Sequence, residues 1–214
     1  MSIHSHKSSA KKTRAVQEPQ RSNGKLRVAA ILKAAADVFA EKGYDVATMA
    51  EIAARSGTKI GSLYRFFPNK ESLADTMVVC ARKNLDAVFD KFDAGVKALS
   101  IRALADDLQI VLFEQTLTPA LMRLLDGSHD WSVKREEFKS AILRRIAKTL
   151  MIYRPKLPKN TAADMAFVVL VNMKALATYR KFPDSLPSAL DEMRDMTRLY
   201  LQSRLGSSRS TKEG

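Results

Sequence analysis

Helical spacing of apolar residues runs through almost the whole chain and constrains the fold more than any other feature. From Leu26 onward apolar side chains recur at helical intervals, and no convincing stretch alternates between apolar and polar residues as a strand does. Turn residues such as Gly43 and Pro68 interrupt this pattern. The expected helices cover about residues 25–41, 48–55, 59–66, 70–92, 100–116, 119–126, 132–152, 161–182 and 186–205. The sequence therefore predicts an all-α fold of about nine helices.

The composition predicts a globular protein without a disulfide or a membrane span. Of the 214 residues, 46% are hydrophobic and 28% are charged, which is the balance of a chain with a buried core. Cys80 is the only cysteine, which excludes an intrachain disulfide and a cysteine-based zinc site. The longest uncharged apolar run, residues 165–173, is far shorter than the roughly 20 residues of a spanning helix. No apolar segment follows the first cations, so we recognise no secretory signal and expect a cytoplasmic protein.

The sequence carries no recognisable catalytic or cofactor-binding motif. It has no G-x-G-x-x-G, P-loop, G-x-S-x-G or H-E-x-x-H pattern. Of its three histidines, His4 and His6 lie in the polar N-terminal segment and His129 stands beside Asp130 in a predicted loop. We therefore expect no enzymatic activity, no cofactor and no metal site.

The excess of positive charge favours a polyanionic partner. The chain has 36 Lys and Arg against 23 Asp and Glu, a net charge of +13, and such charge binds polyanions by displacing counterions. Residues 1–26 hold six of the cations and one Glu. We expect residues 1–24 to form a disordered basic arm, either a solvated tail or a segment that contacts DNA phosphates, and residues 206–214 to form a second disordered tail.

Two short predicted helices around Gly57 have the spacing of a helix-turn-helix. Thr48 and Glu51 form a capping-box pattern at the start of the first helix, which ends near Arg55. A three-residue turn separates it from the second helix, so the motif covers about residues 47–66. In this motif the second helix enters the DNA major groove with its N-terminal residues toward the bases.

The residues of this motif give a specific family resemblance. The run TMAEIAARSGTKIGSLYRFFPNKESL, preceded by RVAAILKAAADVFAEKGYDVA, resembles the DNA-binding domain of the tetracycline-repressor-like (TetR) family over about residues 25–84. The resemblance implies a DNA-binding domain at 25–84 and a regulatory and dimerisation domain at 85–205. It also implies a bacterial, nucleoid-associated transcription regulator: a homodimeric repressor that a small-molecule ligand releases from a palindromic operator in double-stranded DNA.

The resemblance also implies which side chains contact DNA. Gly61 would let the recognition helix approach the groove floor, Ser62 would meet a base or a phosphate, and the Tyr64 hydroxyl would reach a phosphate. Thr48 would combine capping with a phosphate contact, and Lys70 would clamp the backbone from the next helix. The full set of expected DNA contacts is Thr48, Thr58, Lys59, Ile60, Gly61, Ser62, Tyr64, Arg65 and Lys70.

The start of the recognition helix departs from the family pattern. Lys59 and Ile60 stand where serine and a polar residue are frequent, so we expect capping to pass to Thr58. Lys59 would hydrogen-bond to guanine or contact a phosphate. Arg65 would contact DNA or form a solvated ion pair.

The remaining helices are expected to sense a ligand and to form the dimer. The last two, at 161–182 and 186–205, would pack against their copies through Val169, Leu176, Leu190, Met193, Thr197, Tyr200 and Leu201. A small apolar or amphipathic ligand would bind among Phe89, Phe92, Phe113, Met122, Trp131, Phe138, Met151, Asn172 and Met173. As alternatives to a place in the pocket, Asn172 would hydrogen-bond within the core or across the dimer interface. The ligand would act by shifting the helix that begins at Lys70.

Two alternatives keep DNA as the partner. One is a DNA-binding regulator without a small-molecule ligand, controlled by a protein partner or by its abundance. The other is a nucleoid-type protein that binds DNA of any sequence, whereas a regulator prefers its own site by 10³ or more.

Overall fold

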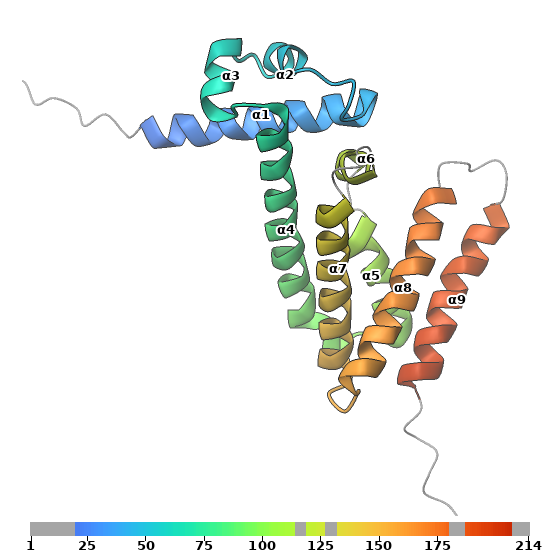
Figure 1. Ribbon diagram of the computed structural model, residues 1–214. Helices are drawn as coiled ribbons and strands as arrows, with labels where there is room; N and C mark the ends of the chain where they lie inside the picture. The colour runs from blue at the N-terminus through green and yellow to red at the C-terminus, as the bar shows by residue number, and fades with distance from the viewer. Residues whose placement is uncertain (1–19, 114–118, 127–131, 180–186, 207–214) are drawn as a thin grey trace, which may run out of the picture.

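The computed structural model describes residues 20–113, 119–126, 132–179 and 187–206, and within these ranges the chain is helical without a strand (Figure 1). This confirms the predicted all-α fold. The helices are α1 (Gln20–Lys42), α2 (Met49–Arg55), α3 (Ile60–Phe66), α4 (Lys70–Gly95), α5 (Ile101–Phe113), α6 (Pro119–Asp126), α7 (Ser132–Tyr153), α8 (Lys159–Tyr179) and α9 (Pro187–Leu205), with a 3₁₀ turn at Val96–Ala98 after α4.

Helices α1 to α3 form a small layer that lies across the end of the longer helices (Figure 1). The Gly43 N–H donates to the Phe39 carbonyl at 3.0 Å with Gly43 at a φ of +84°, so this glycine ends α1 in the left-handed conformation. Ile31 and Phe39 of α1 and Ile52 of α2 are fully buried. The apolar residues that recur at helical spacing in the sequence thus face the core.

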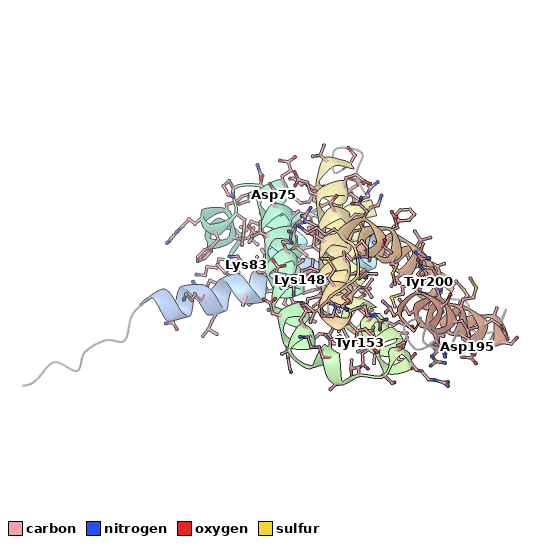
Figure 2. All side chains as sticks on the ribbon, turned by 90° about the horizontal axis from the view of Figure 1, so that it is seen from below. Asp75, Lys83, Lys148, Tyr153, Asp195 and Tyr200 are labelled. Atoms are coloured by element: carbon pink, nitrogen blue, oxygen red, sulfur yellow. The ribbon has the colours of Figure 1, made fainter. Side chains whose placement is uncertain are left out.

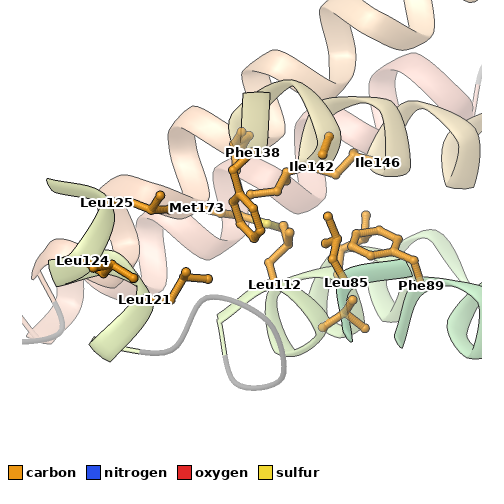
Figure 3. Close-up of a cluster of buried hydrophobic side chains, with 14 of the residues drawn as sticks. Leu85, Phe89, Leu112, Leu121, Leu124, Leu125, Phe138, Ile142, Ile146 and Met173 are labelled. Atoms are coloured by element: carbon orange, nitrogen blue, oxygen red, sulfur yellow. The ribbon is translucent and has the colours of Figure 1, made fainter. Parts of the chain in front are cut away.

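Helices α4 to α9 form the second, larger body, in which α7 packs along α8 and α9 closes the far side. Charged contacts join α4 to α7. Near the end of α4, Arg145 of α7 donates to Asp90 at 2.7 Å and to Asp93 at 3.2 Å. Near the start of α4, Asp75 pairs with Lys134 of α7. A bidentate pair from Arg198 to Asp106, at 2.8 and 3.0 Å, joins α9 to α5. Buried apolar side chains from α4, α5, α6, α7 and α8 pack together in the core of this body (Figure 3).

Several helix ends differ from their predicted positions. Helix α1 begins at Gln20 rather than Lys25, because its first turn lacks the apolar residues that the spacing argument needs. Helix α8 begins at Lys159 rather than Thr161, since the Pro158 carbonyl already accepts the Ala162 N–H at 2.9 Å. Most of the predicted basic arm, residues 1–19, and the predicted tail at 207–214 lie outside the described residues.

Two absences concern only the described residues, 20–113, 119–126, 132–179 and 187–206. None of the helices in these ranges is long and apolar enough to cross a membrane. The same residues contain no cluster of three His, Cys, Asp or Glu side chains that could hold a metal ion.

Candidate nucleic-acid interface

Helix α3 has one side buried against the protein and the opposite side exposed to solvent. Leu63 is fully buried and Phe67, just after the helix, is nearly so, and these two side chains fasten α3 to the domain. The opposite face exposes Lys59, Ile60, Gly61, Tyr64 and Arg65, while Thr58 and Ser62 are half-buried. The structure therefore brings seven of the nine predicted DNA contacts together on or beside one short helix.

The turn before α3 depends on a second left-handed glycine. Gly57 has a φ of +63°, and the following Thr58 N–H donates to the Ala53 carbonyl at 3.0 Å. Lys59 occupies the N-cap position of α3 and makes no side-chain capping bond. Capping therefore does not pass to Thr58 as expected, because the Thr58 backbone is still part of the turn that closes α2.

Thr48 begins α2 in the predicted capping box. Its Oγ1 accepts the Glu51 N–H at 3.2 Å, and the Glu51 carboxylate accepts the Thr48 N–H at 3.1 Å. The hydrogen bond from the Lys42 ammonium, then those from Thr48, lower the pKa of Glu51 to about 2. The carboxylate thus favours folding above its usual pKa near 4.5, and this contribution is lost as the pH falls toward 2. The Thr48 hydroxyl also donates to Glu51 at 3.0 Å, so it is engaged within the protein.

Lys70 points into the protein rather than toward the expected phosphate. Its Nζ donates to the carbonyls of Tyr44, Asp45 and Ala47 at 2.6, 3.0 and 2.9 Å, and lies 4.5 Å from the centre of the Tyr44 ring. An ammonium has three N–H donors, so these three bonds use them all. In this structure Lys70 fixes the α1–α2 loop against the start of α4 and positions the motif.

Lys70→Ala is accordingly expected to lower stability and to leave the electrostatics of DNA binding unchanged. The three carbonyls lose a charged donor, which costs about 2 kcal/mol, or roughly 4–8 °C in the unfolding midpoint. Thermal unfolding and DNA titration over a series of salt concentrations measure both effects, with Lys83→Ala on the exposed face of α4 as control. If Lys70 contacted a phosphate, the slope of log K against log [salt] would flatten by about 0.9 instead.

Comparison with known proteins agrees with this geometry. Residues 31–77, which include α2, α3 and the start of α4, match the model of the bacterial regulatory proteins of the tetR family. This part of the chain thus has the sequence of a TetR-type DNA-binding domain. The transcriptional repressor KstR2 of Rhodococcus jostii (strain RHA1) is 35% identical over 85 residues, which is 39% of this chain and 40% of KstR2. The match thus spans two fifths of that TetR-family repressor.

Solved structures of bacterial transcriptional regulators share the fold over most of the chain. A transcriptional regulator from Aquifex aeolicus VF5 aligns with 81% of this chain and 99% of its own at a TM-score of 0.63 and 22% identity. A TetR-family regulator from Streptomyces coelicolor aligns with 85% of this chain and 98% of its own at a TM-score of 0.57 and 23% identity. At this identity the likeness concerns the fold. Transcription regulators of the TetR family are not enzymes, in agreement with the sequence.

The larger body formed by α4 to α9 has a cavity of about 150 Å³ between α6, α7 and α8. Its lining includes Met122 and Phe138 from the predicted pocket set. Figure 3 shows Phe138 of α7 pointing into the core toward Met173 of α8. Met173 itself is almost fully buried and does not line the cavity.

The other predicted pocket residues lie elsewhere. Phe89 is fully buried with the Arg145 guanidinium 5.4 Å from its ring centre, and Phe92 and Met151 pack at the edge of the core. The Asn172 amide donates to the Met193 carbonyl at 2.9 Å and to the Thr197 hydroxyl, so it joins α8 to α9 within one chain. Trp131 and the side chain of Phe113 lie outside the described residues.

The predicted dimer residues largely face the core of their own protomer. Val169, Leu176 and Leu201 are almost fully buried in the single chain, Thr197 is 6% exposed, and Leu190, Met193 and Tyr200 are half-buried. The apolar side chains that α8 and α9 leave in solvent are Phe167, Val168, Val171, Met196 and Leu199. Sequence analysis missed these five. For the three on α8 the reason is that this helix is apolar on both sides and the sequence does not say which side meets α7.

Proposed function

We propose that this protein is a sequence-specific DNA-binding repressor that acts as a homodimer and leaves a palindromic operator when a small ligand binds. The observation that carries the proposal is the exposed face of α3, where Gly61 lies between two cations, Lys59 and Arg65. Such a face has both the space for close approach and the charge for a phosphate-lined groove. The similarity to KstR2, a transcriptional repressor, supports repression as the outcome.

The exposed apolar side chains of α8 and α9 support the dimer. Figure 2 shows Asp195 and Tyr200 of α9 on the side of the molecule away from α1 and α4. Large side chains such as Phe167 and Leu199 are 51% and 65% exposed on these two helices. A symmetric pair of copies would cover these side chains and present two recognition helices to the two halves of a palindrome.

The cavity between α6, α7 and α8 supports a ligand of small size. Its 150 Å³ equals roughly five water molecules at about 30 Å³ each, so a larger ligand would have to widen it. Two routes connect it to the DNA-binding layer. Three residues separate the start of α4 from the end of α3, and α6 packs directly against α1 (Figure 1).

Selection of bound fragments from a random-sequence DNA library tests the proposal. A regulator is expected to enrich one inverted repeat and to bind it at least 10³ times more tightly than scrambled DNA. Equal affinity for all sequences would instead identify a nucleoid-type protein. An enriched site whose affinity responds to no small molecule would favour the regulator controlled by a protein partner or by abundance.

A further inference from the structure

Ile60 is an exposed apolar side chain on the helix that is proposed to enter the major groove. Helix α3 begins at this residue, directly before Gly61, and the Ile60 side chain is 44% exposed. Leu63 and Phe66 of the same helix pack in or against the core, so they hold α3 in place without it. Single exposed apolar side chains are common on proteins, so the place of Ile60 matters more than its exposure. Figure 1 shows α2 and α3 on the side of α1 away from α5 to α9, so these last helices do not cover Ile60.

The first turn of α3 holds Ile60 in a fixed direction. The Lys59 carbonyl accepts the N–H groups of Ser62 and Leu63 at 2.8 and 3.0 Å, which closes the backbone into a helical turn. A β-branched side chain in a helix has one strongly preferred χ1 rotamer. A Cβ at Gly61 would meet no atom within 4 Å, so the space beside Ile60 is open. Together these features give a rigid apolar group that a flat base edge can approach closely.

The major groove offers an aliphatic side chain one apolar partner. The base edges there present hydrogen-bond donors and acceptors, and their apolar group is the 5-methyl group of thymine. Isoleucine neither donates nor accepts a hydrogen bond through its side chain, so the favourable contact it can make with a base edge is with this methyl group. Lys59 and Arg65 are exposed on the same short helix, and such cations favour the phosphate-lined groove over an uncharged surface as the partner of this face.

We propose that Ile60 contacts the 5-methyl group of one thymine in each half of the operator and thereby selects thymine at that position. This inference rests on the operator binding proposed above and names one base that α3 recognises. The contact removes apolar surface of both groups from water. One buried methyl group contributes about fourfold in affinity, so the two half-sites of a dimer together contribute about 15-fold.

Deoxyuridine in place of thymidine tests the contact, because it pairs with adenine in the same way and lacks only the methyl group. The probe is the inverted repeat enriched from the random-sequence library, with one thymine position at a time replaced in both half-sites. Titration of each version with the full chain measures the affinity. At the position that Ile60 contacts, the deoxyuridine version is expected to bind about 15-fold more weakly than the thymidine version.

Two variants of Ile60 identify the side chain that makes the contact. Ile60→Ala is expected to bind the thymidine and deoxyuridine versions with affinities within about twofold of each other, because the alanine methyl group does not reach the base. Ile60→Val keeps the β-branch and is expected to keep part of the difference. Val79→Ala is the matched control, since it shortens an exposed apolar side chain on α4 and keeps the full difference. Both positions are exposed, so the thermal unfolding midpoint of each variant is expected to stay unchanged.

A second library selection, with Ile60→Ala, gives an independent readout. The variant is expected to lose the preference for thymine at that position and to keep the preferences at the other positions. Two results overturn the proposed contact and leave selective DNA binding untouched: an enriched repeat in which no thymine depends on its methyl group, and an Ile60→Ala variant that keeps the full difference. If the wild-type chain enriches no inverted repeat, the proposed function fails and this inference fails with it. Should Ile60→Ala not fold, Ile60→Val and the deoxyuridine series with the unchanged chain still test the contact.

Discussion

Gly61→Leu is expected to abolish sequence-specific DNA binding, by a factor of 10³ or more, without unfolding the protein. In the free chain a Cβ at Gly61 would meet no other atom within 4 Å, so the domain itself has room for the new side chain. Glycine inside a helix costs about 0.5–1 kcal/mol relative to alanine, so a leucine there does not weaken α3. The leucine instead projects from the face proposed to enter the major groove and holds the helix away from the bases.

DNA titration and thermal unfolding of the same Gly61→Leu preparation separate the two effects. The unfolding midpoint is expected to stay unchanged or to rise slightly. Gly95→Leu is the matched control, because a Cβ at Gly95 also meets no atom within 4 Å but this glycine ends α4, far along the chain from α3. Normal operator binding by Gly61→Leu would mean that another surface reads the DNA.

Local features of the fold were predictable from the sequence because their causes are local. The Thr48–Glu51 capping box, the Asn69 cap of α4 and the left-handed Gly43 each depend on residues within one or two turns of chain. The burial of Leu63 agrees with its helical spacing, whereas Ile60, one turn earlier, is 44% exposed. These elements position α3, so the face of the recognition helix could be predicted before its surroundings were known.

Roles that depend on distant parts of the chain could not be predicted this way. Lys70 matches the family motif in sequence, yet its ammonium meets carbonyls more than twenty residues earlier in the chain. Arg135 lies in no motif, and its hydrogen bond to the Leu125 carbonyl near the end of α6 appears only in the structure. Aromatic residues such as Phe89 were assigned to the pocket because spacing shows that they face inward and does not show whether they meet a void or another side chain.

The dimer surface is another feature that helical spacing alone could not predict. Spacing identified apolar residues on α8 and α9, but Val169 and Leu201 turned out to be 1% and 0% exposed within a single chain. A charge at either position would be buried without a partner and would destabilise the protomer. The surface available to a second copy is the neighbouring set of Phe167, Val168, Val171, Met196 and Leu199.

The double variant Phe167→Asp with Leu199→Asp is expected to be a folded monomer that has lost most of its affinity for the operator. Both side chains reach solvent in the single chain, so the carboxylates stay hydrated there, whereas dimerisation would bury two like charges from each copy. A monomer meets one half-site only, so operator affinity falls by roughly 10³, toward that of nonspecific DNA. Sedimentation equilibrium gives the mass, and DNA titration gives the affinity. The control, Val79→Asp, changes an apolar side chain of similar exposure (54%) on α4 and should remain a dimer. A double variant that stays dimeric, or a monomer with full operator affinity, would show that the copies pair elsewhere or that pairing is not needed to read the site.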